Sequence, residues 1–252
     1  TIGNILDLIE KDDMPKYLLF LENAFPYMDN YNYHKGMNGI IQELTGLLKT
    51  KNIGTDSDRA LLLDFQATLE TKPEKAIKLE KDALAQIENI TADNARLVSN
   101  LHANLGGLYR MNGHPDLARE HMEKSISLLD QFNLLHINDS IPQIANYAMF
   151  LTEQQEPERG ISELQKLSGI IKEYHSDDCL DYAKVQETLG TIYLMTANLP
   201  QAKTHFKRAF KIYEKIWADE PEMIEAKYQE IQELYPQIGF CIGKNLSGLL
   251  TK

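Results

Sequence analysis

Apolar residues recur every three or four positions along most of the chain, with polar residues between them. This spacing predicts amphipathic α-helices, because one face of a helix returns after 3.6 residues. No stretch alternates with the period of two that is typical of a half-buried strand. Glycine and proline residues separate the periodic segments and mark turns. We expect helix pairs at 56–70 with 73–89, 93–112 with 115–132, 138–153 with 157–173, and 179–197 with 199–216.

These pairs share a repeat of 42 residues. The stretch Asn-Leu-Gly-Gly-Leu-Tyr at 104–109 returns 84 residues later as Thr-Leu-Gly-Thr-Ile-Tyr at 188–193, with a degenerate copy midway at 146–151. A step of 42 back from Ala118 lands on Ala76, so four units share one phase. A repeat unit buries its apolar face only against its neighbours, and the period therefore predicts an elongated stack. The small third residue of each stretch is expected where the two helices of a pair touch.

The two ends depart from this phase. The expected organisation is one continuous solenoid with an irregular N-terminal helical pair at 1–54, four repeat units at 55–217 and C-terminal capping helices at 218–252. Terminal units of solenoids are atypical because one of their faces meets water. The expected terminal helices are 13–27, 32–50, 220–234 and a short one between Pro236 and about 250.

The last unit carries a recognisable pattern in Leu189, Gly190, Tyr193, Ala202, Phe206 and Ala209. This pattern resembles the tetratricopeptide repeat, and the 42-residue spacing is similar to the kinesin-light-chain type. The resemblance implies an all-α, right-handed superhelical solenoid of antiparallel helix pairs that binds a protein or an extended peptide in its concave groove. The segment Glu-Lys-Ile-Trp-Ala-Asp-Glu-Pro at 214–221 is also similar to the C-terminal repeat regions of bacterial signalling ATPases of the NB-ARC or STAND kind.

The resemblance implies that the first helices of the units line the groove. Asn104 and Asn146 lie 42 residues apart and resemble the family position where an asparagine hydrogen-bonds the backbone of a bound peptide. The alternative is that these two asparagines only bridge neighbouring helices. Arg110 and Lys184 are suited to hold an acidic side chain or a terminal carboxylate. The full set of expected groove residues is Asn100, Asn104, Gly107, Arg110, Asn146, Met149, Lys184, Thr188 and Thr191.

The charge balance narrows the choice of partner. The chain has 37 acidic and 26 basic residues and a net charge of -11 with histidine neutral. This argues against nucleic acid and anionic lipid, which need clustered positive charge. No apolar run approaches the roughly 20 residues of a membrane helix. Cys179 and Cys241 form no CxxC motif, so we expect a reducing cytoplasm and no disulfide framework.

Motifs of catalysis and cofactor binding are missing. The sequence has no Walker-type loop, GxGxxG, HExxH or nucleophile elbow, so we expect a non-enzymatic segment without catalytic residues, cofactor or metal. His114 and His121 can share a helix face but lack a third ligand for zinc. The carboxylates of Asp177 and Asp178 disfavour the thiolate of Cys179, which makes this sulfur a poor nucleophile.

Two hypotheses of function follow. The first is a protein- or peptide-binding scaffold. The second is a ligand-sensing segment of a larger bacterial STAND-type ATPase or transcriptional regulator, whose upstream domains would be further partners in the same chain. The chain starts at Thr1 instead of Met, which is compatible with the second hypothesis.

Overall fold

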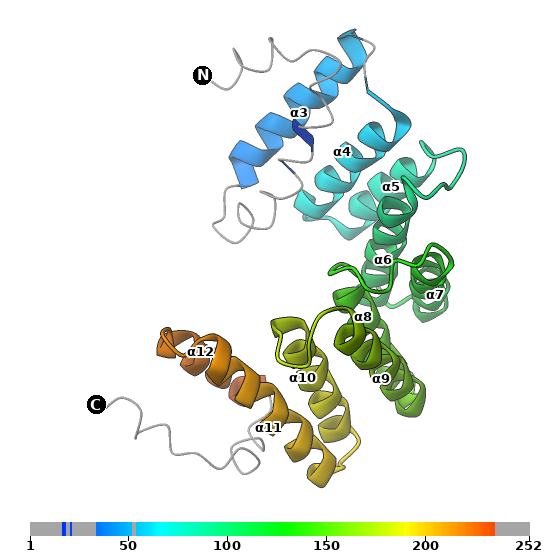
Figure 1. Ribbon diagram of the computed structural model, residues 1–252. Helices are drawn as coiled ribbons and strands as arrows, with labels where there is room; N and C mark the ends of the chain where they lie inside the picture. The colour runs from blue at the N-terminus through cyan, green and yellow to red at the C-terminus, as the bar shows by residue number, and fades with distance from the viewer. Residues whose placement is uncertain (1–16, 19–20, 22–33, 52–53, 235–252) are drawn as a thin grey trace. The chain divides into compact units, whose positions relative to one another are not determined.

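The computed structural model describes residues 17–18, 21, 34–51 and 54–234 of the chain. These residues form ten helices and no strand, as the hydrophobic periodicity predicts (Figure 1). The helices are α3 (His34–Lys51), α4 (Asp56–Leu69), α5 (Pro73–Leu84), α6 (Ala95–Met111), α7 (Pro115–Gln131), α8 (Ser140–Glu153), α9 (Pro157–Tyr174), α10 (Leu180–Met195), α11 (Leu199–Ile216) and α12 (Pro221–Leu234). Most of the expected helix at 13–27 and all of the one after Pro236 lie outside the described residues.

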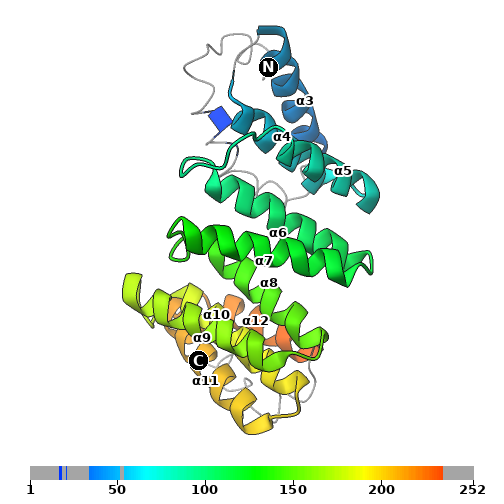
Figure 2. The same cartoon turned by 90° about the vertical axis from the view of Figure 1, so that its right-hand side faces the viewer.

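The chain divides into two compact units, residues 1–132 and 133–252. In the first unit, α4 packs on α5 and α6 packs on α7, while α3 covers α4 and α5 also contacts α6. In the second unit, α8 packs on α9 and α10 on α11, with further contacts from α10 to α8 and α9 and from α11 to α12. The short turns inside the pairs make the two helices of each pair antiparallel, as α6 and α7 are in Figure 2. The predicted arrangement of antiparallel helix pairs is therefore confirmed.

The turns inside three of the pairs are built alike. One residue in each turn has a left-handed backbone, and these residues are 42 apart: Gly113 (φ 74°), Gln155 (φ 65°) and Ala197 (φ 59°). The next amide in each turn donates to a carbonyl five residues back, as His114 N does to Tyr109 O at 2.9 Å. This closure satisfies carbonyl groups that the helix end would leave without partners. The turn between α4 and α5 differs, because Glu70 caps α4 in an extended conformation.

Small residues allow close contact within the pairs, as expected. A Cβ atom added to Gly106 of α6 would lie 2.6 Å from Met122 Cγ, and one added to Gly190 of α10 would lie 2.9 Å from the Phe206 ring. In α9, a Cβ atom on Gly160 would lie 2.6 Å from the carbonyl oxygen of Ala148. Real side chains do not approach this closely, so these glycines set the spacing between the helices of each pair.

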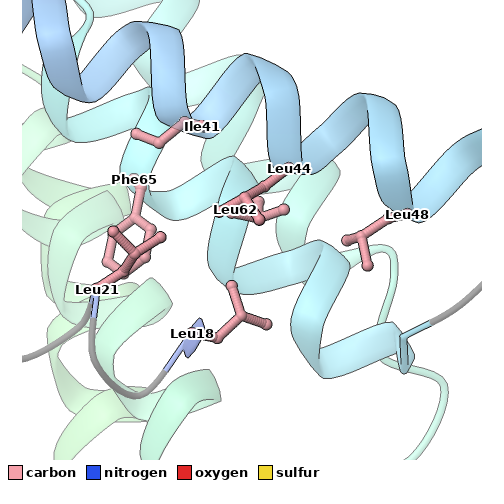
Figure 3. Packing of buried hydrophobic residues seen from close by; sticks show 7 residues of the cluster. All are labelled: Leu18, Leu21, Ile41, Leu44, Leu48, Leu62 and Phe65. Carbon is pink, nitrogen blue, oxygen red and sulfur yellow. The ribbon is translucent and has the colours of Figure 1, made fainter. Parts of the chain in front are cut away.

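An apolar cluster joins α3 to α4 at the N-terminal end of the array. Ile41, Leu44 and Leu48 recur along one face of α3 and meet Leu62 and Phe65 of α4 (Figure 3). Two earlier residues, Leu18 and Leu21, complete this cluster. The expected helix at 32–50 is therefore present as α3, and Met37, Ile41, Leu44 and Leu48 form its buried face.

The predicted end of the second helix at residue 89 is wrong, because α5 ends at Leu84. In the following connection, the side chain of Asn94 binds the local backbone. The amide of Thr91 donates to Asn94 Oδ1 at 2.8 Å, and Asn94 Nδ2 donates to the carbonyl of Asn89 at 2.9 Å. Such local hydrogen bonds compete with helix formation. The other pair boundaries lie within two residues of the predicted ones.

Candidate functional site

Three polar side chains from three helices converge in the first unit. Asp64 projects from α4, Glu80 from α5 and Asn104 from α6. Asn104 Nδ2 donates a hydrogen bond of 2.8 Å to Asp64 Oδ1. Glu80 is hydrogen-bonded to both Asp64 and Asn104. We call these three residues the carboxyl cluster.

The carboxyl cluster runs from the interior to the surface. Glu80 is 1% exposed, Asp64 is half-buried and Asn104 is exposed. The Oε2 atom of Glu80 is buried and has no hydrogen-bond partner. Buried polar atoms in native proteins are nearly always paired, so an unpaired carboxyl oxygen at the base of a polar cluster calls for an explanation.

The 42-residue phase shows how unusual this cluster is. Asp64 occupies the repeat position that the other three pairs fill with Gly106, Ala148 and Gly190. Glu80 occupies the position that they fill with Met122, Leu164 and Phe206. In those pairs, a small residue on the first helix accompanies a large apolar residue on the second, and all three large residues are buried. Two carboxyl groups therefore stand where the repeat otherwise has an apolar contact.

Burial and charge keep a proton on Glu80. Burial raises the pKa of Glu80, and the charge of Asp64 and a hydrogen bond to it raise that pKa further, to about 10. The hydrogen bond from Asn104 opposes this shift in part. At neutral pH the Glu80 carboxyl is thus protonated and donates to Asp64, and the pair carries a single negative charge.

Open space lies next to the exposed end of the carboxyl cluster. Gly107 is one turn along α6 from Asn104, on the same face of the helix. A Cβ atom added to Gly107 would meet nothing within 4 Å, in contrast to its neighbour Gly106. A group from another molecule therefore has room to approach Asn104 and Asp64 on this face.

The residues expected to line a groove all lie on first helices, in both units. On α6 of the first unit, Asn104 is exposed, and Asn100, Gly107 and Arg110 are half-buried. The expected residues of the second unit are Asn146 (exposed) and Met149 (half-buried) on α8, and Lys184 (exposed), Thr188 and Thr191 (half-buried) on α10. Asn104 bridges neighbouring helices, α6 and α4, which is the contact expected under the alternative to peptide binding. Its role toward a peptide stays a prediction.

A pocket of about 270 Å³ lies beside Lys184 in the second unit, between α10, α11 and α12. Tyr213 and Trp217 are stacked along its wall, with ring centroids 4.9 Å apart. Lys184 Nζ has an ion pair of 3.8 Å with Asp181, and the side chain remains 54% exposed. The pocket therefore offers an aromatic wall and an accessible ammonium group.

A polar network fastens α12 next to this pocket. Tyr213 Oη donates to Glu187 Oε2 at 2.6 Å, and Lys227 Nζ lies 2.9 Å from Glu187 Oε1. Burial acts to lower the pKa of Lys227, but the charges of Glu187 and Glu230 and hydrogen bonds to them outweigh burial and raise it. Lys227 is therefore an ammonium ion at neutral pH and links α12 to α10.

His114 and His121 both contact the ring of Tyr109, with centroids 6.2 and 5.4 Å from it. His121 of α7 also meets His102 of α6, with the two Nδ1 atoms 2.9 Å apart. Burial, followed by the neighbouring His121 and Lys124, lowers the pKa of His102 to about 4. In α10–α11, Gln186 and His205 form the equivalent contact at 2.9 Å. These contacts tie the two helices of a pair together.

The remaining expected features concern metal and membrane. Among the described residues, no group of three or more His, Cys, Asp or Glu side chains is arranged to hold a metal ion. Cys179 caps the start of α10, where its Sγ accepts from the amide of Tyr182 at 3.5 Å. Within the same part of the chain, no helix has both the length and the apolar character needed to cross a membrane.

The sequence prediction included Asn104 but missed Asp64 and Glu80. The signal was present, because a step of 42 back from Gly106 and Met122 reaches these two residues. Polar residues at core positions of a repeat are departures that point to function.

Comparisons with known proteins support the expected resemblance. The tetratricopeptide repeat family model matches residues 140–215. Two structures of a putative kinesin light chain with nearly identical TPR-like repeats, from Podosopora anserina, are similar in fold. One, which is of a point variant, gives a TM-score of 0.64 at 13% identity over 83% of this chain and 99% of that chain. The other gives 0.60 at 14% identity over 77% and 93%.

A third similar structure is BtubC (BKLC) from P. vanneervenii. Its TM-score is 0.53 at 18% identity, over 80% of this chain and 74% of that chain. At these identities the likeness concerns the fold. The comparison with curated proteins gives no match.

Proposed function

We propose that the chain, whose residues 140–215 match the tetratricopeptide repeat family model, is a protein-interaction scaffold that binds an extended peptide on the first helices of its pairs. The observation that carries this proposal is the solvent-facing Asn104, with Asp64 beside it and open space at Gly107. Polar groups on an accessible helix face that leaves room for a ligand are suited to an extended backbone.

Two further features support a peptide as the ligand. Asn146 occupies on α8 the repeat position of Asn104 and is also exposed. An asparagine amide has donors and an acceptor, so Asn146 can pair with both polar groups of a peptide backbone, whereas Asn104, which donates to Asp64, offers its carbonyl oxygen to a backbone amide. In the second unit, Lys184 stands beside an aromatic-walled pocket and is available for a carboxylate. The free thiol of Cys179 supports a reducing, cytoplasmic setting.

The test is a peptide selection followed by substitution. Peptides are selected from a random twelve-residue display library on the purified chain, and the affinity of a selected synthetic peptide is measured by fluorescence anisotropy. We expect Asn104→Ala with Asn146→Ala to weaken binding about tenfold or more, because each lost hydrogen bond to a ligand contributes roughly 0.5–1.5 kcal/mol.

Matched controls keep this test specific. Gln131→Ala and Gln165→Ala remove exposed amides from the second helices α7 and α9 and should leave the affinity unchanged. Thermal melting of all variants reports whether the fold is kept. Unchanged binding by the folded double asparagine variant would contradict the proposal.

A further inference from the structure

We infer that the carboxyl cluster of Asp64, Glu80 and Asn104 is a subsite for a basic side chain, arginine or lysine, of the bound peptide. This inference rests on the proposed function and adds to it the chemistry of the ligand in the first unit. It concerns a position of α4, α5 and α6 where the repeat pattern calls for apolar residues.

The cluster is rich in hydrogen-bond acceptors. Asp64 and Glu80 together present four carboxyl oxygens, and Asn104 gives its amide hydrogens to both residues. One of the four oxygens, Glu80 Oε2, has no partner although it is buried. A guanidinium group brings five N–H donors and an ammonium group brings three, each with a positive charge. A basic side chain therefore brings a donor for Glu80 Oε2 and a positive charge that complements the two acids.

The entry side of the cluster is the solvent side. Asp64 is half-buried and Asn104 exposed, while Glu80 lies beneath them. Space in front of Gly107 leaves room for the backbone that carries the basic side chain. The net charge of -11 favours the approach of a cationic partner over that of an anionic one.

Stability alone does not account for the cluster. Met122, Leu164 and Phe206 fill the repeat position of Glu80 in the other pairs, and each is at most 4% exposed. A buried acid at such a position lowers stability compared with an apolar residue of similar size. Departures of this kind from the pattern of a fold concentrate at binding sites.

Binding of a basic side chain releases a proton. In the free protein, burial and the neighbouring carboxylate of Asp64 keep Glu80 protonated, with a pKa of about 10. The bound cation takes the place of this proton: the O–H bond of Glu80 breaks, the proton passes to solvent, and a carboxylate–cation pair forms. Asp64 on α4 is the titratable group that acts on Glu80, and Asn104 on α6 is its neutral neighbour. Affinity should therefore rise with pH, by at most about tenfold per unit.

A basic side chain fits better than a divalent metal ion. Calcium takes six to eight oxygen ligands, as a general rule, and magnesium requires near-octahedral geometry. The cluster offers one half-buried carboxylate, one protonated acid and one amide. Its donor set suits hydrogen bonding to a planar or tetrahedral cation on a side chain.

The first arm of the experiment uses the random dodecapeptide library with the complete chain at pH 7.5. The wild type should enrich peptides with arginine or lysine at one position. Asp64→Asn should abolish that enrichment, because the variant removes the negative charge and keeps the shape. Asp82→Asn is the matched control, since Asp82 is exposed on the same helix as Glu80 and lies outside the cluster.

The second arm measures proton release with one selected peptide. Its affinity for the wild type should rise at least fivefold between pH 6.5 and 8.0, and calorimetry in two buffers of different ionisation enthalpy should report release of close to one proton. In Glu80→Gln, which mimics the protonated acid, affinity should not change with pH. Glu80→Met, which carries the residue found at position 122, is a second variant should the glutamine variant fail to fold.

The possible results separate the two proposals. Selected peptides that bind the first helices but lack a basic position would overturn the subsite and keep the scaffold. No selected peptide at all would overturn both. Stoichiometric binding of Mg²⁺ or Ca²⁺ alone, lost in Asp64→Asn, would identify a metal site and overturn the peptide subsite.

Discussion

The first helix pair, α4–α5, and the last, α10–α11, make the same contact with opposite chemistry. In α10–α11, Gly190 lets the ring of Phe206 pack closely against the first helix, and Phe206 is fully buried. In α4–α5, Asp64 and Glu80 occupy these two positions, 126 residues earlier. The backbone arrangement of an antiparallel pair is kept in both.

The difference shows two ways to fill the contact between the helices of a pair. In the last pair, glycine makes room for a large ring. In the first pair, a neutral acid is buried against a carboxylate that accepts its hydrogen bond. The acid pair depends on pH and leaves Glu80 Oε2 without a hydrogen-bond partner. It therefore contributes little to stability and is better suited to binding a ligand.

The largest expected effect on stability comes from placing a glutamate in the last pair without the partners that Glu80 has in the first. Phe206→Glu places a carboxyl group opposite Gly190, without the aspartate that Glu80 meets in the first pair. Loss of the buried ring and burial of an unpaired polar group should lower the free energy of unfolding by about 4 kcal/mol or more. Urea denaturation followed by circular dichroism measures this change.

Phe206→Met is the control for that substitution, because methionine occupies the equivalent position 122. It should cost below about 2 kcal/mol, since methionine adapts to irregular space. A glutamate variant as stable as the methionine variant would show that the position tolerates an isolated acid, and the contrast between the two pairs would disappear.

The second prediction removes the proton from the first pair. The pKa of Glu80 is raised from 4.5 to about 10 in the folded protein, so its contribution to stability is complete below pH 4.5 and declines as pH rises toward 10. Glu80→Gln does not titrate. The variant should therefore become more stable relative to the wild type as pH rises from 5 to 9, by at most about 1.4 kcal/mol per unit.

Denaturation midpoints at several pH values test this prediction, with Asp82→Asn as the exposed control. Parallel pH profiles for the wild type and Glu80→Gln would mean that Glu80 ionises normally in the folded protein.

The third prediction uses two adjacent glycines of α6. Gly106→Ala should destabilise the protein by about 1–3 kcal/mol, because the new Cβ atom lies 2.6 Å from Met122 Cγ and 3.3 Å from the carbonyl of Ala118. Gly107→Ala meets open space and should stabilise the helix by about 0.5–1 kcal/mol. Thermal melting of both variants measures the difference, and equal shifts would contradict the assigned packing role of Gly106.

The smallest expected effects lie in the turns. Gln155→Gly and Ala197→Gly relieve a left-handed backbone at a side-chain-bearing residue, which costs about 1–2 kcal/mol in such residues, although the freer unfolded chain offsets part of the gain. We expect a net stabilisation below about 1 kcal/mol. Gly113→Ala, at the equivalent turn of α6–α7, should destabilise instead, and a gain there would contradict the shared geometry.

The 42-residue repeat was sufficient to predict most of the fold. Periodicity and turn residues predicted the helix pairs, because helix formation and turn geometry depend on local residues. The end of α5 was missed because the side chain of Asn94 binds the backbone groups of Asn89 and Thr91 in a way that periodicity does not reveal. The predicted three-part organisation of the chain stays a prediction.

The carboxyl cluster was only partly predictable. Asn104 was identified from its position, but its contact is with Asp64, 40 residues earlier on another helix. The pKa of Glu80 depends on burial and on a neighbouring charge, both of which arise only when α4, α5 and α6 pack together. The position 42 residues before Met122 is Glu80, so the sequence alone places an acid at a core position. Its protonation depends on the packing of the three helices.

Direct titration of Glu80 tests the central claim, that the first pair buries a protonated acid. Carbon-13 labelling of glutamate side chains, with Glu80→Gln to assign the signal, follows the carboxyl shift of Glu80 from pH 5 to 9 by NMR. We predict the shift of a protonated acid throughout the neutral range, with ionisation only as pH approaches the pKa of about 10. A signal that ionises between pH 4 and 6, as in an exposed glutamate, would contradict the account.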